Sequence, residues 1–287
     1  MLLSTSFYVN AESFGKLPVF NINTPISGIA KVSDGTYIGV LDIKDNSNTN
    51  LVIIKKENNR FNITPINNDK IKNNLGNSEA HTSYLEGICS IGNGNLLTIE
   101  SGYKNKSKRR LITLNYNNGN IELLNENPLP GDASLNFEAI ACEKSNANNS
   151  YNIIIADRAS GRAFLGKKYI GQGDVNFKEI TKIKTNYSFG VINRNVSELF
   201  SINSKIYGSA TNDGVLLRSV IYSIDIDLAD DDAMNKLPKE INLNGSNIVK
   251  IIDNYKIEAI SNIDWKELIL ASDNDSYNNG IISLKLK

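Results

Sequence analysis

Five short segments of this chain place a hydroxyl or carboxylate side chain in the same setting. In each segment an apolar residue precedes the polar one, and another apolar residue ends the segment. The polar residues are Ser27, Glu86, Glu138, Ser197 and Glu258, and a small residue follows four of them. The segments begin at residues 26, 85, 137, 196 and 257, a spacing that is regular and too long for a helical repeat. Three carboxylates and two hydroxyls form an all-oxygen set, which is the ligand chemistry that Ca²⁺ prefers.

A second set of polar residues follows the first at a similar distance in every repeat. Its members end an apolar run, and they are Asp42, Glu100, Asp157, Asn212 and Asp273. The distance is longer only in the third copy, where an Asn-rich turn is inserted at residues 145–149. The two sets therefore repeat together, which indicates that one repeated fold positions both.

The elements that must position these residues read as β-strands, because short β-rich runs alternate with turn residues. The inner hairpins are expected at residues 26–29 with 37–41, 85–88 with 96–99, 137–140 with 153–156, 196–199 with 206–210 and 257–260 with 268–271. A third strand is expected at residues 51–54, 111–114, 163–165, 220–224 and 281–284. Four repeats offer a fourth strand, at residues 61–66, 121–124, 177–183 and 240–243.

Four-stranded units that repeat in this way predict an all-β fold, a five-bladed β-propeller with antiparallel blades, as a single domain over residues 1–287. The last repeat lacks a fourth strand. The run around Phe7-Tyr8-Val9 is expected to supply it by pairing with residues 281–284. Such pairing closes the ring and removes two exposed sheet edges.

In a propeller the inner strand begins, and the second strand ends, on the same face of the disc. Both polar sets are therefore expected around the axis of that face. Three glutamates there need a counter-charge, because burial and mutual repulsion raise their pKa values. A Ca²⁺ ion held by Ser27, Glu86, Glu138, Ser197 and Glu258 would supply it, and no Cys/His cluster suggests zinc. The alternative is that the glutamates accept hydrogen bonds from the backbone of neighbouring blades.

The order Ser, Glu, Glu, Ser, Glu around the ring resembles the calcium-activated nucleotidase (apyrase) family, five-bladed propellers with an axial calcium ion. Asp157-Arg158-Ala159-Ser160 is similar to that family's Arg-Ala-Ser segment. The resemblance implies calcium-dependent hydrolysis of nucleoside di- or triphosphates. It also implies that acids at the ends of the second strands, here Asp42, Glu100 and Asp157, position the attacking water, and that Arg158 clamps a phosphate.

Three further residues are candidates for substrate binding on that face: Asn212 and Asp273 from the second polar set, and His81 in the loop that enters the second repeat. His81 is the only histidine, and an acid/base or phosphate-donor role competes with that of a solvated loop residue. Two other functions stay open. One is a lactonase- or phosphoesterase-type propeller hydrolase, and the other is a non-catalytic binding propeller stabilised by calcium.

The charge balance narrows the choice of partners. The chain has 31 basic and 31 acidic residues, so nucleic acids and membranes are not expected partners, and we expect a small anionic substrate, a nucleotide or another phosphate. No apolar run suits a signal peptide or a membrane span, which predicts a soluble protein, either cytoplasmic or secreted with its leader removed. Cys89 and Cys142 are expected to be small buried hydrophobes rather than a disulfide.

Overall fold

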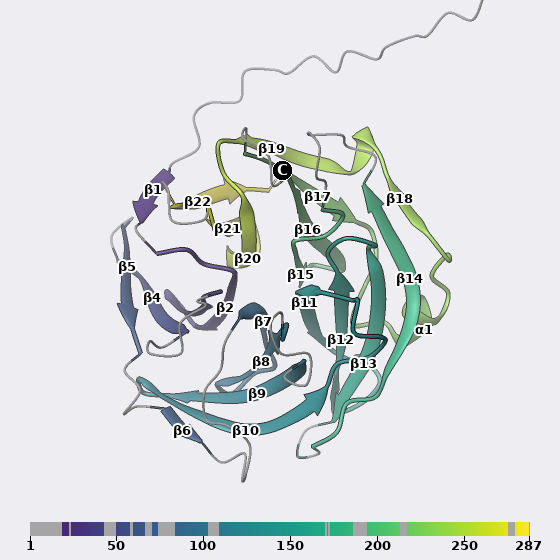
Figure 1. The fold of residues 1–287 in the computed structure, drawn as a ribbon, viewed down its shortest axis with the longest axis horizontal. Coiled ribbons are helices and arrows are strands. Elements are labelled where there is room, and N and C mark those ends of the chain that lie inside the picture. Colours follow the sequence, from purple (N-terminus) through teal and green to yellow (C-terminus); the bar gives the residue numbers. More distant parts are fainter. Residues whose placement is uncertain are drawn as a thin grey trace, which may run out of the picture.

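The computed structural model describes residues 19–22, 24–42, 50–57, 60–66, 71–73, 84–102, 109–169, 171, 173–185, 194–212, 217–274 and 279–286. Five β-sheets surround a central axis, which confirms the predicted all-β, five-bladed propeller (Figure 1). Three sheets have four strands and two have five. All five inner hairpins lie where the sequence predicts them.

The strands follow one another from the axis to the rim in every blade. Blade 1 contains β2 (Gly28–Ser33), β3 (Thr36–Val40), β4 (Leu51–Glu57) and β5 (Arg60–Pro65). Blade 2 contains β7 (Leu85–Ser90), β8 (Asn95–Glu100), β9 (Arg110–Asn117), β10 (Asn120–Pro128) and β6 (Ile71–Asn73). Blade 3 contains β11 (Phe137–Lys144), β12 (Ser150–Asp157), β13 (Arg162–Tyr169), β14 (Phe177–Thr185) and β18 (Ile241–Leu243).

The remaining two blades have four strands each. Blade 4 contains β15 (Glu198–Ile202), β16 (Lys205–Thr211), β17 (Arg218–Ile224) and β19 (Ile248–Asp253). Blade 5 contains β20 (Ile257–Asp264), β21 (Glu267–Ser272), β22 (Asn279–Lys285) and β1 (Val19–Ile22). A short helix α1 (Asp231–Asn235), capped by Asp230, and a 3₁₀ turn η3 (Gly245–Asn247) connect β17 to β18 and β19.

The outer edge of blade 5 is occupied by β1, which pairs antiparallel with β22 between Val19 and Ile282 and between Ile22 and Asn279. The sequence assigned this edge to the run around Phe7-Tyr8-Val9, and that run lies outside the described residues.

The outer strand of blade 4 differs from the prediction. Residues 240–243 were expected there, but β18 instead runs parallel to β14 of blade 3, with Ile241 opposite Ile183. The next apolar run forms β19, which pairs antiparallel with β17. The connection through α1 is long enough to reach the neighbouring blade, so the first run after it adds to blade 3 and the second returns to blade 4.

The small residue of the repeated segment has a packing reason. A Cβ atom on Gly28 would lie 2.5 Å from the carbonyl oxygen of Glu86, and one on Gly87 would lie 2.6 Å from the carbonyl oxygen of Glu138. Neighbouring inner strands therefore approach so closely at the axis that a larger side chain does not fit without displacing the backbone. These two contacts place the repeated segments of blades 1, 2 and 3 side by side at the axis.

The two cysteines form a disulfide, which corrects the prediction of free, buried thiols. Cys89 on β7 and Cys142 on β11 are joined, with their Cα atoms 5.7 Å apart, so the bond links the inner strands of blades 2 and 3. The prediction was wrong because burial alone does not distinguish a thiol from a half-cystine. In the part of the chain that is described, no helix has the length and apolar character that a membrane span requires.

Candidate functional site at the propeller axis

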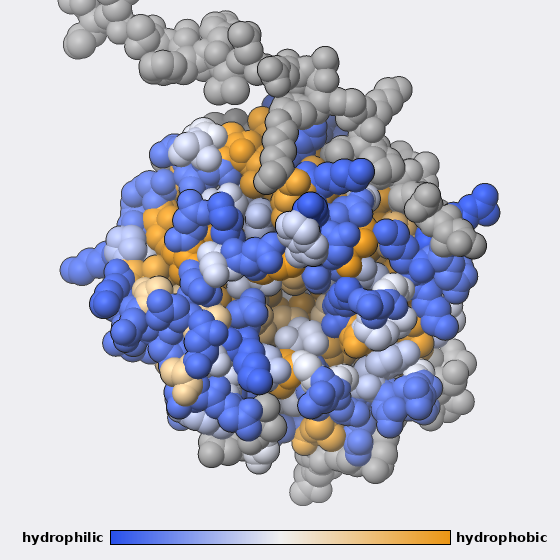
Figure 2. All heavy atoms as spheres, turned by 180° about the vertical axis from the view of Figure 1, so that it is seen from behind, coloured by the Kyte–Doolittle hydropathy of each residue, from blue (hydrophilic) through white to orange (hydrophobic). Residues whose placement is uncertain are grey.

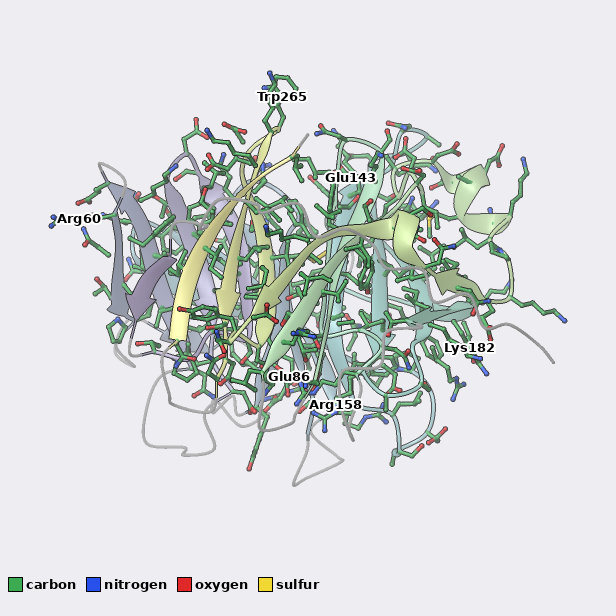
Figure 3. The ribbon with its side chains drawn as sticks, turned by 90° about the horizontal axis from the view of Figure 1, so that it is seen from above. Arg60, Glu86, Glu143, Arg158, Lys182 and Trp265 are labelled. Carbon is green, nitrogen blue, oxygen red and sulfur yellow. A yellow bond between two sulfur atoms is a disulfide. The ribbon has the colours of Figure 1, made fainter. Side chains whose placement is uncertain are left out.

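The polar residues of the repeated segments do meet around the axis, on the face that carries Glu86 and Arg158 in Figure 3. In blades 2, 3 and 5 the pairing of the inner strands is interrupted at the glutamate, between Leu85 and Ile88, between Phe137 and Ala139, and between Ile257 and Ala259. Such bulges redirect a side chain out of the ladder. Glu86, Glu138 and Glu258 are consequently 8%, 5% and 6% exposed, in a low-dielectric setting.

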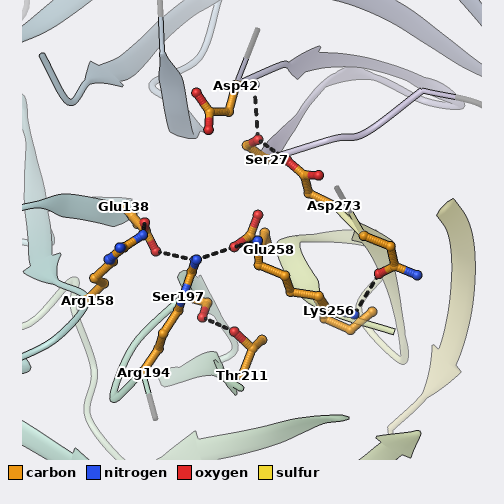
Figure 4. A network of polar contacts seen from close by, with 12 residues as sticks. Ser27, Asp42, Glu138, Arg158, Arg194, Ser197, Thr211, Lys256, Glu258 and Asp273 are labelled. Atoms are coloured by element: carbon orange, nitrogen blue, oxygen red, sulfur yellow. Dashed lines mark hydrogen bonds and ion pairs between the residues drawn. The ribbon is translucent and has the colours of Figure 1, made fainter. Parts of the chain in front are cut away.

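Basic side chains of the protein neutralise two of these glutamates (Figure 4). Arg194 lies between them: its Nη1 donates to Glu138 Oε2 at 2.9 Å and also to Glu258 Oε1. Arg158 Nη1 donates to the other oxygen of Glu138 at 2.6 Å. Lys256 Nζ lies 3.1 Å from Glu258 Oε1. The axis therefore contains a connected network of acids and bases.

Arg194 and Lys256 were missed by the sequence analysis. Both precede a repeated segment, Arg194 before Val196 and Lys256 before Ile257, so they enter the axis from the strand connection and not from the repeat itself. A basic residue just ahead of the fourth and fifth segments was the available signal. It is weak because the first three segments lack it.

Glu86 differs electrostatically from the other two glutamates. Burial raises its pKa well above the usual range, and the negative charges of Glu138, Asp42 and Glu258 raise it further, while Arg194 opposes the shift. Among the described residues none forms an ion pair with Glu86. Burial also raises the pKa of Glu138, but there Arg194 and Arg158 act in the opposite direction. Of the three ring glutamates, Glu86 is therefore the one that most strongly favours the protonated form.

The two serines of the ring bond to their own surroundings. Ser27 Oγ accepts a hydrogen bond from the backbone N–H of Asp42 at 3.1 Å and donates to Asp273 Oδ2 at 3.4 Å. Ser197 Oγ and Thr211 Oγ1 are 2.9 Å apart, and either hydroxyl is able to donate. The structure thus brings Ser27, Asp42 and Asp273 together, as the sequence predicts for neighbouring polar sets.

Two of the predicted catalytic acids have structural partners instead of facing the network. Glu100 is fully buried and accepts from Arg110 Nε at 2.5 Å. Asp157 accepts from the backbone N–H groups of Asn136 and Ser160, at 2.6 and 2.7 Å, and so holds the turn after β12. In these contacts the carboxylate oxygens accept from local donors.

Besides Asp273, which bonds to Ser27, three residues were predicted to bind substrate, and their surroundings differ. Arg158 belongs to the network, and one third of its side chain is exposed, at 33%, so this end of the site is open to solvent. Asn212 is buried and accepts from the backbone N–H of Arg218 at 2.8 Å, which is a structural contact. His81 lies outside the described residues.

Glu198 was also missed as a notable residue. It takes the place of the small residue in the fourth segment, and its Oε1 accepts from the backbone N–H of Ile140 at 3.1 Å and of Leu199 at 2.8 Å. Burial raises its pKa well above the usual range. Glu198 is not one of the three ring glutamates, but it makes the bond to the backbone of a neighbouring blade that was the alternative for them.

The arrangement does not fit an axial calcium ion as it stands. The guanidinium of Arg194 bridges Glu138 and Glu258, which is where a cation shared by these carboxylates would lie. Within the described residues, no group of three or more His, Cys, Asp or Glu side chains is arranged to hold a metal ion. Calcium coordination by the five ring residues stays a prediction, and it requires Arg194 to move.

Comparison with known proteins identifies the fold but no family. No family model and no curated protein matches the sequence. A GH43_1 enzyme from Xanthomonas citri is similar in structure with a TM-score of 0.52 and 8% identity, over 94% of this chain and 91% of that one. A GH43 β-xylosidase/α-arabinofuranosidase from a compost microbial metagenome, solved with xylotriose in a calcium-free form, gives 0.51 and 11%, over 93% and 92%.

Another match is to a larger protein. The chain spans only 28% of the extracellular domain of the putative one-component system BT4673 from B. thetaiotaomicron, at 14% identity and a TM-score of 0.39. The similarity to the GH43 enzymes is distant and supports the five-bladed propeller architecture, without specific support for the apyrase family.

Proposed function

We propose that this protein is a hydrolase that cleaves glycosidic bonds by acid–base catalysis at the axial network. The observation that carries the proposal is the contrast between Glu86 and Glu138. Glu86 is buried without an ion-pair partner in the described structure, whereas Glu138 is bonded to two guanidinium groups. Two neighbouring carboxyls whose surroundings shift their pKa values to different extents, Glu86 well above the ordinary value and Glu138 less because two guanidinium groups oppose the shift, are the arrangement that glycoside hydrolysis uses.

The roles follow from the protonation states. Protonated Glu86 donates its proton to the oxygen of the leaving sugar as the bond to the anomeric carbon breaks. Glu138, whose ionised form is favoured by its bonds to Arg158 and Arg194, acts as the base and accepts a proton from the water whose oxygen bonds to that carbon. The fold similarity to GH43 enzymes supports a glycosidic substrate, and the sugar stays open.

Glu86→Gln is expected to reduce kcat for oligosaccharide substrates by about a hundredfold or more, because the amide has no acidic proton to donate to the poor sugar leaving group. Release of reducing sugar from β-xylo-oligosaccharides and α-arabinofuranosyl oligosaccharides in the presence of a chelator measures it. Glu122→Gln, on the outer strand β10, is the matched control and should leave kcat unchanged. A fully active Glu86→Gln variant, or a wild type inactive on every glycoside, would contradict the proposal.

Nucleoside diphosphates with added calcium are assayed beside the glycosides. Arg158 has a partly exposed guanidinium, and this group suits phosphate oxygens. Hydrolysis of phosphoanhydrides is therefore the second candidate function. Phosphate release that needs calcium, with no glycosidase activity, would make that candidate the correct one.

The pH profile provides an independent prediction. A general acid must be protonated, so activity should be retained below the pKa of Glu86 and lost as pH rises through it. Since burial and neighbouring charges place this pKa well above that of an ordinary glutamate, the alkaline limb should lie well above the usual carboxyl range. The dependence of kcat/KM on pH measures it, and an alkaline limb at an ordinary carboxyl pKa would contradict the assignment.

A further inference from the structure

A second cavity lies at the opposite end of the axis, on the face that carries Glu143 and Trp265 in Figure 3. Figure 2 shows this face hollowed at its centre. The cavity has a volume of about 540 Å³ and is lined from all five blades, by the ends of β2, β7, β11, β15 and β20 and the turns that follow. Small-molecule sites typically measure about 300–1,000 Å³, so this one is large enough for a small organic ligand.

The charge inside this cavity is set by Glu143. In the described part of the chain no Lys or Arg forms an ion pair with its carboxylate, which is partly buried. Lys31 is the only basic residue of the lining, and it is already paired: its Nζ donates to the carbonyl oxygen of Ile263 at 3.0 Å and lies 2.9 Å from Asp34, the other acidic residue of the lining. The lining therefore carries one negative charge that its own residues do not neutralise.

Burial raises the pKa of Glu143, Asp227 raises it further, and Ser201 opposes the shift. The carboxylate is therefore less stable here than in water, and a bound cation would relieve that cost.

Two other lining residues point to a ligand with an apolar body and a polar head. The Ser261 hydroxyl is fully buried and has no hydrogen-bond partner among the described residues, so it retains an unused donor and acceptor. Phe200 offers an aromatic ring, and aromatic rings attract organic cations. The disulfide between Cys89 and Cys142 forms part of the wall and ties two of the lining strands together, which keeps the cavity preformed.

We propose that this cavity binds a small alkylammonium ligand, with the ammonium group on the Glu143 carboxylate and the alkyl part against Phe200 and the apolar wall. A carboxylate without a basic partner, an aromatic ring and an unused hydroxyl together recognise a cation with an apolar body better than an anion or a neutral sugar. The site is separate from the axial network and does not depend on the proposed hydrolase activity.

Calorimetric titration of the full chain with butylammonium and choline chlorides tests the proposal. We expect at least one of the two to bind. The neutral isostere of choline, 3,3-dimethyl-1-butanol, should bind at least tenfold more weakly because it lacks the charge. Equal binding of the alcohol, or no binding of either cation, would overturn the proposal.

Variants locate the site. Glu143→Gln should weaken cation binding at least tenfold and Phe200→Leu several-fold, while Glu122→Gln on β10 should bind like the wild type. Thermal unfolding of each variant without ligand separates loss of binding from loss of folding. Unchanged affinity in a folded Glu143→Gln variant would place the cation elsewhere and overturn the assignment.

Discussion

Arg194→Met is expected to lower the free energy of unfolding by about 3–5 kcal/mol, the usual cost of removing one partner from a buried ion pair. The side chain of Arg194 is 9% exposed, and those of Glu138 and Glu258 are 6% and 8% exposed. Methionine fills similar space but leaves Glu258 with Lys256 and Glu138 with Arg158 as their remaining basic partners. Urea denaturation monitored by circular dichroism measures the change.

Arg218→Met is the matched control for this experiment. Arg218 pairs with Asp253 at 2.5 Å, but the two side chains are 49% and 60% exposed. Exposed pairs contribute about 0–1 kcal/mol, so this variant should unfold almost like the wild type. Equal small losses in the two variants would show that the axial network does not depend on Arg194.

Arg194→Met also tests whether the axial glutamates are neutralised by an arginine side chain or by a metal ion. With Arg194 removed, calcium has access to Glu138 and Glu258, and a ligand at a hundred times its Kd stabilises by about 2.7 kcal/mol. Added calcium should therefore raise the Tm of Arg194→Met and leave the wild-type Tm unchanged. A wild type that loses stability with chelator would show instead that calcium is resident and that Arg194 lies elsewhere when the ion is bound.

The repeat could be predicted from sequence because packing imposes it locally. Gly28 and Gly87 are required by the backbone of the next blade, and the apolar neighbours of each polar residue are buried, so the same pattern appears wherever an inner strand passes the axis. The convergence of Glu86, Glu138 and Glu258 follows from that pattern and from propeller geometry. Although the contacts themselves join different blades, each copy of the pattern can be recognised from a few consecutive residues.

The counter-charges could not be predicted in the same way. Arg194 and Lys256 lie outside the repeated segments and reach the axis only because of the path of the chain between blades, which no local pattern specifies. The sequence analysis therefore assigned the neutralising charge to a metal ion. The prediction for the outer strand of blade 4 was wrong for a similar reason. A short apolar run such as Ile241–Leu243 fits the edge of either neighbouring sheet, and it pairs with β14 of blade 3.

The disulfide is the other feature that needed spatial information. Cys89 and Cys142 lie four and five residues after the first residues of consecutive repeated segments, and inner strands of consecutive blades are neighbours. Their places in neighbouring inner strands were thus the signal for a disulfide, and burial alone does not reveal it. A covalent link between two inner strands should contribute much more to stability than two buried thiols.

Replacing both cysteines by alanine is expected to lower the free energy of unfolding by about 4 kcal/mol, because the bond closes a loop with a sequence separation of 53 residues and restricts the unfolded chain. Denaturant titration of wild type and variant measures the loss. Reductant should shift the wild-type curve most of the way to that of the variant, and the remaining difference measures the packing lost with the sulfur atoms. The variant itself should not respond to reductant, which controls for other effects of the reagent. Two titratable thiols in the native wild type under oxidising conditions, or a wild-type curve that reductant does not shift, would contradict a disulfide that stabilises blades 2 and 3.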